Sequence, residues 1–278
     1  MKTEEIISIF CLCSDFCKDL KIKDHPNAKM AHSEVITVGI LSALYFGGNL
    51  LLTKQYCLEF KLFTSIISRE ELTRRLLNIP QGIWACMIAI LARAAKKQCN
   101  DEYIIDSFPI PFCHPCRSKL CKIAHGKEYL GYCASKKMYY YGMKAHVLVN
   151  RLGQLVELKI TPARFSDTSA LEFMDMNLPK GSILYGDKAY NSYQKEDKLF
   201  KKNQIRILAQ RRKNLKRQHS PEENKRIKKY RKRVETAISA MIRKFPRAFY
   251  VRSLRGFQLR AILCIIAPML SLCGALSH

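Results

Sequence analysis

The chain has 278 residues, enough for one large domain or two smaller ones, and its apolar content of 48% excludes a wholly disordered protein. Its 48 Lys and Arg against 23 Asp and Glu give a net charge of +25. The excess is uneven, because residues 1–95 hold 11 basic and 9 acidic side chains, whereas residues 201–233 hold 15 basic and 2 acidic. Such a basic segment indicates binding to a polyanion or to an acidic membrane surface. An enzyme that acts on small neutral metabolites would not need it.

The twelve cysteines do not indicate a disulfide framework. The chain is too long for a disulfide-stapled mini-protein, and Cys57, Cys86 and Cys264 lie in apolar runs where thiols pack as small hydrophobic groups. The start, MKTEEIISIF, lacks the pattern of a secretory signal, so we expect a cytoplasmic protein with reduced thiols. The most apolar run, residues 261–276, is shorter than the roughly 20 residues of a membrane span and contains Pro268. We expect a buried helix there and no membrane partner.

Residues 1–98 are predicted to form a small all-helical domain. Ser33 begins one helix, Ser68 and Glu71 have the spacing of a capping box at the start of another, and residues 83–95 form a further apolar helix. Because the charge of this region is nearly neutral, two roles stay open for it: binding the ends of a DNA molecule, or packing and dimerisation.

Residues 99–278 are predicted to form a mixed sheet with helices on its faces. Apolar and alternating runs predict strands at 103–105, 139–150, 155–161, 182–186 and 205–209. Helices are predicted at 166–178, at 190–202 and from about residue 220 onward. Residues 107–137, rich in Pro, Cys, Lys and Gly, are expected to be irregular.

Three acidic residues form the candidate site. Asp106 and Asp187 each follow a predicted buried strand, where a carboxylate needs a metal, an arginine or a cap to compensate its burial. Glu235 lies at the margin of the apolar stripe of the long helix. Taken singly, either aspartate is explained as a turn or cap residue, and Glu235 is explained as a surface ion pair with Arg231. Together, they have the chemistry to hold two divalent ions, Mg²⁺ or Mn²⁺, for an in-line displacement at phosphorus.

Four segments, in this order, resemble the DDE transposases of bacterial insertion sequences: IIDSFP around Asp106, GMKAH at 142–146, LYGDKAY around Asp187 and RKRVETAIS around Glu235. The resemblance covers roughly residues 100–250 and is greatest to the compact family numbered nine-eighty-two. It implies a ribonuclease-H-like catalytic domain at 99–278, with Asp106, Asp187 and Glu235 as the metal-binding triad.

The resemblance further implies double-stranded DNA as the partner, both at the terminal inverted repeats of an element and at the target. Hydrolysis would free a 3′-hydroxyl, which would then attack target DNA in a bacterial, nucleoid-associated setting. Because two ends must be joined, a dimer or larger assembly is expected. Candidate phosphate contacts are Lys144, His146, Arg211, Arg212, Lys213, Lys228, Arg231 and Lys232.

A second class of function stays open, a nucleic-acid-binding protein without catalysis, as does an inactive transposase copy. Cys113, Cys116, Cys121 and His125 place four zinc donors within 13 residues, and the C-x₂-C spacing suits a tetrahedral site. Chance pairs are expected among twelve cysteines, so zinc is the less favoured interpretation. Metal-dependent nicking of DNA distinguishes the two classes.

Overall fold

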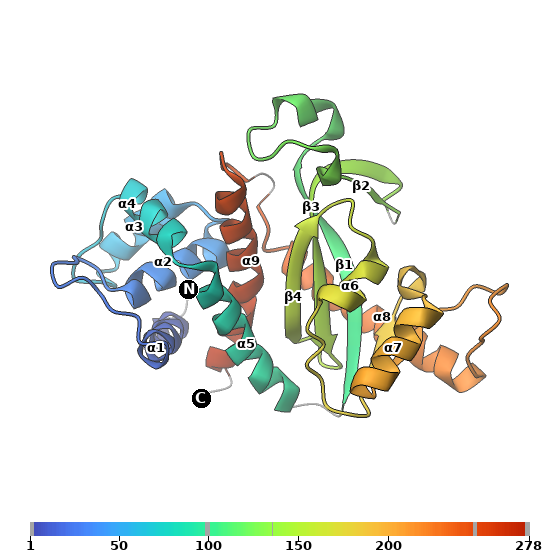
Figure 1. Cartoon of the computed structure of the whole chain (residues 1–278). Helices are drawn as coiled ribbons and strands as arrows, with labels where there is room; N and C mark the ends of the chain where they lie inside the picture. The colour runs from blue at the N-terminus through green and yellow to red at the C-terminus, as the bar shows by residue number, and fades with distance from the viewer. Residues whose placement is uncertain (1–2, 98–100, 135, 247–248, 276–278) are drawn as a thin grey trace. The chain divides into compact units, whose positions relative to one another are not determined.

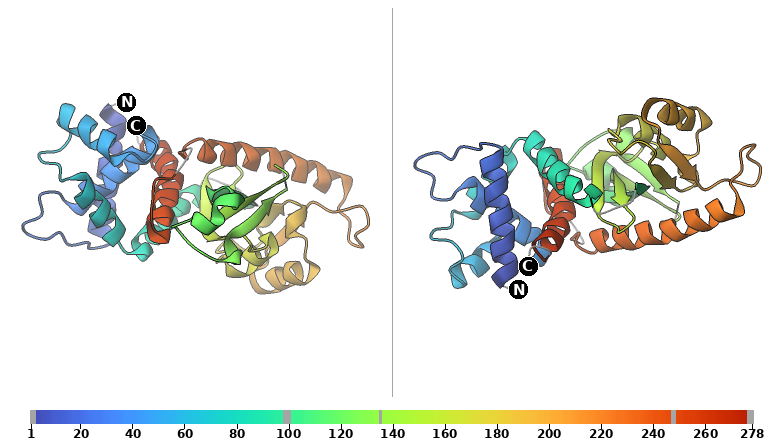
Figure 2. Two further views of the ribbon diagram at one scale, coloured as in Figure 1. Left: turned by 90° about the horizontal axis from the view of Figure 1, so that it is seen from above. Right: turned by 90° about the horizontal axis from the view of Figure 1, so that it is seen from below.

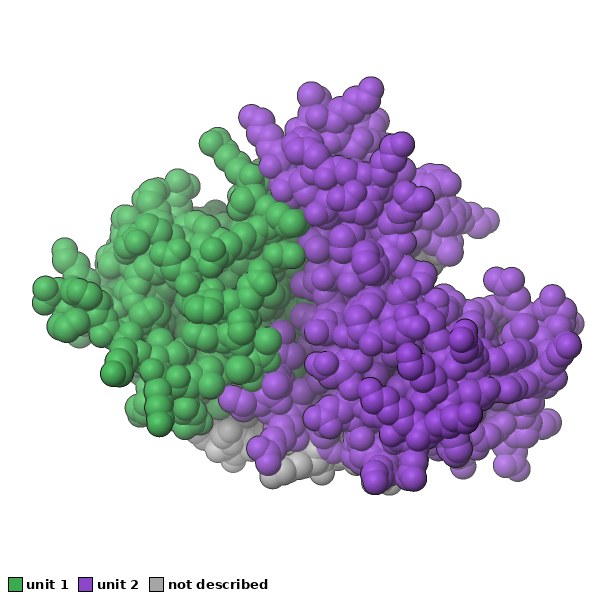
Figure 3. All heavy atoms as spheres, in the orientation of Figure 1, with its two compact units in different colours: residues 1–87, 241–278 green, residues 88–240 purple. Residues whose placement is uncertain are grey.

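The structure is a computed structural model and describes residues 3–97, 101–134, 136–246 and 249–275; for residues 97 and 271–275 it describes the backbone only. The chain divides into two compact units, shown in different colours in Figure 3. Unit 1 comprises residues 1–87 and 241–278, and unit 2 comprises residues 88–240. These units differ from the predicted division at residue 98, because the C-terminal helix belongs to the same unit as the N-terminal helices.

Unit 1 is built from helices. They are α1 (Thr3–Asp19), α2 (His32–Tyr45), α3 (Leu50–Glu59), α4 (Arg69–Asn78), the start of α5 (Gln81–Lys97) and α9 (Leu254–Ala275). Helix α2 is buried on nearly all sides and contacts α1, α3, α4 and α9. The predicted cap of α4 is confirmed, since the Ser68 hydroxyl accepts a hydrogen bond from the Glu71 N–H at 3.1 Å.

Helix α9 is buried, as the apolar run predicted, and it packs within unit 1. From Ala261 to Leu270 every residue is apolar, and such a helix segment needs partners on every side. It finds them in α1, α2 and α4, where Phe257, Ala261 and Ile265 are fully buried. Within the described residues, no single helix is long and apolar enough to cross a membrane, although two bent pairs, α2 with α3 and α4 with α5, pass that test jointly.

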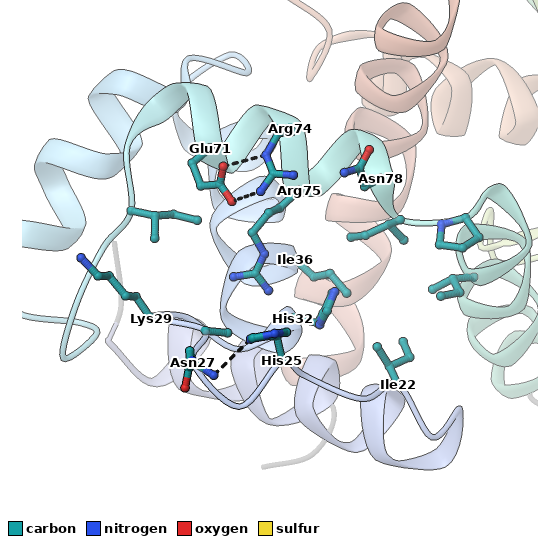
Figure 4. A pocket seen from close by; sticks show the side chains of 15 residues that line it. Ile22, His25, Asn27, Lys29, His32, Ile36, Glu71, Arg74, Arg75 and Asn78 are labelled. Atoms are coloured by element: carbon teal, nitrogen blue, oxygen red, sulfur yellow. Dashed lines mark hydrogen bonds and ion pairs between the residues drawn. The ribbon is translucent and has the colours of Figure 1, made fainter.

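Unit 1 also contains a pocket of about 560 Å³, lined by α2, α4 and the segment between α1 and α2 (Figure 4). Most of its basic groups already have acidic partners. Arg74 binds Glu71 at 2.5 Å, His32 lies 2.6 Å from Asp24, and Arg75 lies 3.8 Å from the same carboxylate. Because its charges are largely neutralised, this pocket is not the cationic surface that the composition predicts.

Unit 2 is built around a six-stranded mixed sheet. Its strands are β1 (Glu102–Cys113), β2 (Leu130–Cys133), β3 (Met138–Asn150), β4 (Leu155–Pro162), β5 (Ile183–Gly186) and β6 (Arg206–Ala209). The order is β2-β3-β1-β5-β6, with β4 beside β3. The pairs β1–β3, β2–β3 and β3–β4 are antiparallel, whereas β1–β5 and β5–β6 are parallel. The predicted fold class, a mixed sheet with flanking helices after an N-terminal helical region, is confirmed.

Helices cover both faces of this sheet, with α6 (Asp167–Phe173) and α7 (Tyr193–Asn203) on one face and α8 (Pro221–Ile242) on the other (Figure 2). On the first face, Tyr103 and Ile105 of β1 share a buried cluster with Leu171 of α6 and Leu199 of α7. On the second, the Tyr185 ring of β5 stacks on Tyr230 of α8, with ring centroids 4.4 Å apart. The two faces therefore have separate cores.

Strand β1 is much longer than predicted and continues past Asp106 to Cys113, through residues expected to be irregular. Its parallel pairing with β5 is recorded only from Glu102 to Ile104, and beyond that point the described ladder pairs β1 with β3 alone. Proline is tolerated on such an open edge because no N–H is needed there, which allows Pro109 and Pro111 within the strand.

Candidate active site

The strand register places the two aspartates of the site side by side. Ile104 of β1 lies beside Tyr185 of β5, and extending this parallel register by two residues sets Asp106 beside Asp187. Side chains two residues apart on a strand share a face. Both carboxylates therefore lie on the face of Tyr185, which is the face that α8 covers through Tyr230.

Burial and mutual repulsion disfavour the charged forms of both aspartates. Burial, with smaller contributions from the negative charges of Asp187 and Asp167, raises the pKa of Asp106 to about 7. Burial also raises the pKa of Asp187, with a smaller contribution from the charge of Asp167. The guanidinium of Arg231 acts in the opposite direction on both. The site thus concentrates negative charge that a cation stabilises.

Glu235, the third predicted ligand, lies one helical turn along α8 from Arg231. Its Oε1 is 3.4 Å from Arg231 Nη2, and its side chain is 59% exposed. Arg231 also donates a hydrogen bond from Nη1 to Gln210 Oε1 at 2.7 Å. The structure therefore brings Asp106 and Asp187 together and places Glu235 on the facing helix, bound to the arginine that also interacts with the aspartates.

The donor chemistry of the aspartate pair fits a divalent cation. Two adjacent carboxylates supply the oxygen ligands that Mg²⁺ prefers, and their burial, the main cause of their raised pKa values, makes an uncompensated negative charge unfavourable there. In the part of the chain that the structure describes, no group of three or more His, Cys, Asp or Glu side chains is arranged to hold a metal. Neither the acidic triad nor the cysteine cluster at 113–125 is therefore arranged as a metal site. Glu235 is instead paired with Arg231 through its Oε1.

Asp167 is the site residue that the sequence missed, because its position after Ser166 is explained fully as the start of a helix. Its Oδ1 accepts a hydrogen bond from Ser107 Oγ at 2.7 Å and lies 3.3 Å from Lys144 Nζ. His146 Nδ1 is 3.8 Å from the same oxygen. In the sequence, this contact is signalled only by the alternation of side chains along the strands. The alternation places Ser107 and His146, which are cross-strand partners, on the same face of the sheet.

Lys144 and His146 are oriented toward the protein, which corrects their assignment as phosphate contacts. His146 is fully buried, its ring packs edge-on against Phe173 at 5.5 Å, and burial lowers its pKa to about 4. Lys144 donates a second hydrogen bond to the Phe165 carbonyl at 2.9 Å. Lys144 therefore stabilises Asp167, whereas His146 is held by Thr161, whose hydroxyl lies 3.0 Å from its Nε2.

Arg211 also needs correction as a phosphate contact. Its guanidinium donates two hydrogen bonds to Glu196, with Nη1–Oε1 2.7 Å and Nη2–Oε2 2.5 Å apart. The two side chains are only 5% and 9% exposed. By contrast, the exposed candidates of the basic segment are Arg212, Lys213, Lys228 and Lys232.

Replacing Arg211 by methionine should lower the free energy of unfolding by about 3–5 kcal/mol, because Glu196 would be left as a buried, uncompensated charge. Replacing the exposed neighbour Arg212 by alanine should change it by no more than about 0.5 kcal/mol. Urea unfolding of the two variants and the wild type measures the difference. Equal stabilities would mean that the Arg211–Glu196 pair is open to solvent.

Asp106→Asn should stabilise the metal-free protein, and the gain should depend on pH. A raised pKa means that protonation stabilises the folded state at low pH and that this stabilisation is lost as the pH rises through about 7. The gain from Asn, which avoids the buried charge, should therefore be largest near pH 8, on the order of 3 kcal/mol, and should shrink toward pH 5. Asp197→Asn is the control, because Arg217 lowers the pKa of Asp197, so this change should give no gain. A pH-independent difference for Asp106→Asn would contradict the burial of its carboxylate.

Aspartates on adjacent strands of a mixed sheet, faced by a helix that carries a glutamate, are consistent with a ribonuclease-H-like catalytic domain. Residues 96–247 match the family model described as the transposase DDE domain. Since this match covers more than half of the chain, the protein belongs to the transposase DDE domain family, as the resemblance predicted. No curated protein and no solved structure matches the chain. Membership supports a transposase function and implies DNA as the partner.

Proposed function

We propose that this protein is an insertion-sequence transposase that cuts DNA at the terminal inverted repeats of its element and transfers the freed 3′ ends to target DNA. The observation that carries the proposal is the register that sets Asp106 beside Asp187 on the face covered by α8. Family membership and the exposed cations of residues 201–233 support it. We further propose that it acts as a dimer or larger assembly in the bacterial cytoplasm.

Asp106 and Asp187 would hold two Mg²⁺ ions with Glu235 as the third ligand. When bound, such ions activate the attacking oxygen and stabilise the leaving one at phosphorus. Arg231 would compensate the carboxylates in their absence and exchange its partner Glu235 for a DNA phosphate when DNA arrives. Asp167, held by Ser107 and Lys144, would fix the backbone next to Asp106.

The exposed residues Arg212, Lys213, Lys228 and Lys232 would contact DNA phosphates without reading sequence. These contacts release counterions, so the affinity would fall steeply with salt. The role of unit 1 stays open between binding of the element ends and dimerisation.

The acidic residues should act as one unit, and only in chemistry. Asp106→Asn, Asp187→Asn and Glu235→Gln should each lower Mg²⁺-dependent cleavage by at least about 100-fold, because each removes a ligand of the shared ions. Combining them should cost little more than a single change. DNA affinity should hold or rise, since a negative charge is lost near phosphate. The measurement is cleavage of end-containing DNA with and without Mg²⁺, and Glu222→Gln, an exposed acid on the same helix, is the matched control.

The position of Glu235 matters as much as its charge. Glu235→Ala combined with Thr236→Glu turns the carboxylate about 100° around the helix and should not restore cleavage. If Glu235→Gln keeps full activity, the third ligand lies elsewhere, and Asp167 is then the first residue to test. Glu157 is less suitable, because its carboxylate accepts hydrogen bonds from the N–H groups of Asp175 and Met176. DNA binding without any metal-dependent nicking would favour the non-catalytic alternative.

A further inference from the structure

Residues 114–134 and 136–139 of unit 2, here called the arm, connect the end of β1 to the start of β3 and contain two short 3₁₀ helices and β2 (Figure 1). A small aromatic cluster holds the arm against the ends of β1 and β3. The ring of Phe112 lies 5.5 Å from Tyr129 and 6.0 Å from Tyr141, and the two tyrosine rings are 6.1 Å apart. The Tyr141 hydroxyl also donates to the carbonyls of Ala124 and Gly126, at 3.2 Å each. The arm is thus a folded extension.

The arm carries six basic side chains and one acidic one, Glu128. All six basic side chains are exposed, and none forms an ion pair with any residue that the structure describes. This differs from the basic segment, where Arg206, Arg211 and Arg217 each bind an acidic side chain of the protein. The six are Arg117, Lys119, Lys122, Lys127, Lys136 and Lys137. Because these cations have no ion-pair partner among the described residues, they are available to an external anion.

Two tyrosines form an exposed aromatic pair among these cations. Tyr132 of β2 and Tyr139 of β3 are direct cross-strand partners, with ring centroids 5.0 Å apart. Their side chains are 51% and 60% exposed. Aromatic rings beside cations suit nucleic acids, whose sugars and bases pack against rings while phosphates meet the charges. A protein partner fits less well, because lysine is depleted in protein interfaces.

The tyrosine pair lies on the same sheet face as the aspartate pair. Tyr139 and Val147 are eight residues apart on β3, an even number, so their side chains share a face, and Val147 is the cross-strand partner of Asp106. At about 3.3 Å per residue, the two positions are roughly 26 Å apart along the strand. This span equals about eight base steps of a DNA duplex at roughly 3.4 Å each.

We infer that the arm is a second DNA-binding surface, which holds the duplex about eight base pairs from the phosphate that is cleaved. Its six cations contact phosphates, and Tyr132 and Tyr139 pack against sugars and base edges. The inference rests on the proposed function for the place of the cleaved phosphate, but the binding of DNA by the arm is tested separately. The tyrosines supply contacts that salt does not screen, whereas the cations supply salt-dependent affinity.

The test measures binding of fluorescent duplex DNA that carries the element end, by anisotropy at several salt concentrations. The double variant Tyr132→Ala and Tyr139→Ala should bind about tenfold more weakly with an unchanged salt slope, and Phe at both positions should keep wild-type affinity. The triple variant Lys119→Gln, Lys122→Gln and Lys127→Gln should reduce the salt slope by up to about three units. Phe200→Ala, at a 57% exposed aromatic residue of α7 on the opposite face of the sheet, is the control and should bind like the wild type.

Hydroxyl-radical footprinting with Asp106→Asn, which should bind without cutting, locates the contact. Protection about eight base pairs from the cleavage position should be lost when the two tyrosines are also replaced, while protection at the cleavage position stays. If the wild type binds DNA and the arm variants bind with the same affinity and salt slope, the inference about the arm is wrong and the proposed function stands. If the wild type binds no DNA, the proposed function itself fails, and the inference fails with it.

Discussion

The fold of unit 2 depends on a short parallel contact between β1 and β5, because this contact fixes two like charges side by side in a partly buried site. The recorded pairing spans Glu102 to Ile104, yet its register determines where Asp106 and Asp187 lie. On the α8 face, the Tyr185 and Tyr230 hydroxyls both donate to the Glu102 carboxylate, which ties the helix to the beginning of β1. The carboxylates repel each other, and the surrounding packing must therefore hold the strands in place. This arrangement lowers the stability of the fold locally, and a proton, the guanidinium of Arg231 or a bound cation reduces the cost.

The sequence predicted the parts of unit 2 that depend on local patterns. Alternation located β3 and β4, apolar runs located β5 and β6, and the helical stripe of Ile227, Tyr230, Val234 and Ile238 is buried as expected. The residues that sequence reasoning misjudged are those whose partners are distant in the chain. Asp167 meets Ser107 from 60 residues away, and Arg211 meets Glu196 from 15 residues away. Neither contact follows from periodicity, because a side chain's partner is decided by how separate elements pack.

The packing partners of a whole helix are as hard to predict from sequence as those of a single side chain, and α9 of unit 1 is an example. The apolar character of α9 predicted burial but gave no indication of the neighbours that would bury it. Its partners precede it by some two hundred residues, and Arg260 of α9 donates a hydrogen bond to the carbonyl of Gly48 within the same unit. A chain that leaves unit 1, forms the sheet and returns makes unit 2 an insertion between two helical segments. The functional division into an end-binding region and a catalytic region stays a prediction, which the packing units do not decide.

The number of basic residues in a segment differs from the number that are free of an acidic partner, and the second number matters for the proposed DNA binding. The basic segment has a net charge of +13 in residues 201–233, from 15 basic and 2 acidic side chains, but several of its arginines neutralise acids of the protein itself. A paired guanidinium contributes little counterion release, because it has already exchanged its counterion for a carboxylate. The arm has fewer cations, yet its six have no acidic partner among the described residues. All six basic side chains of the arm are therefore available to an incoming phosphate backbone, whereas four of the fifteen in the basic segment are already paired with acids of the protein.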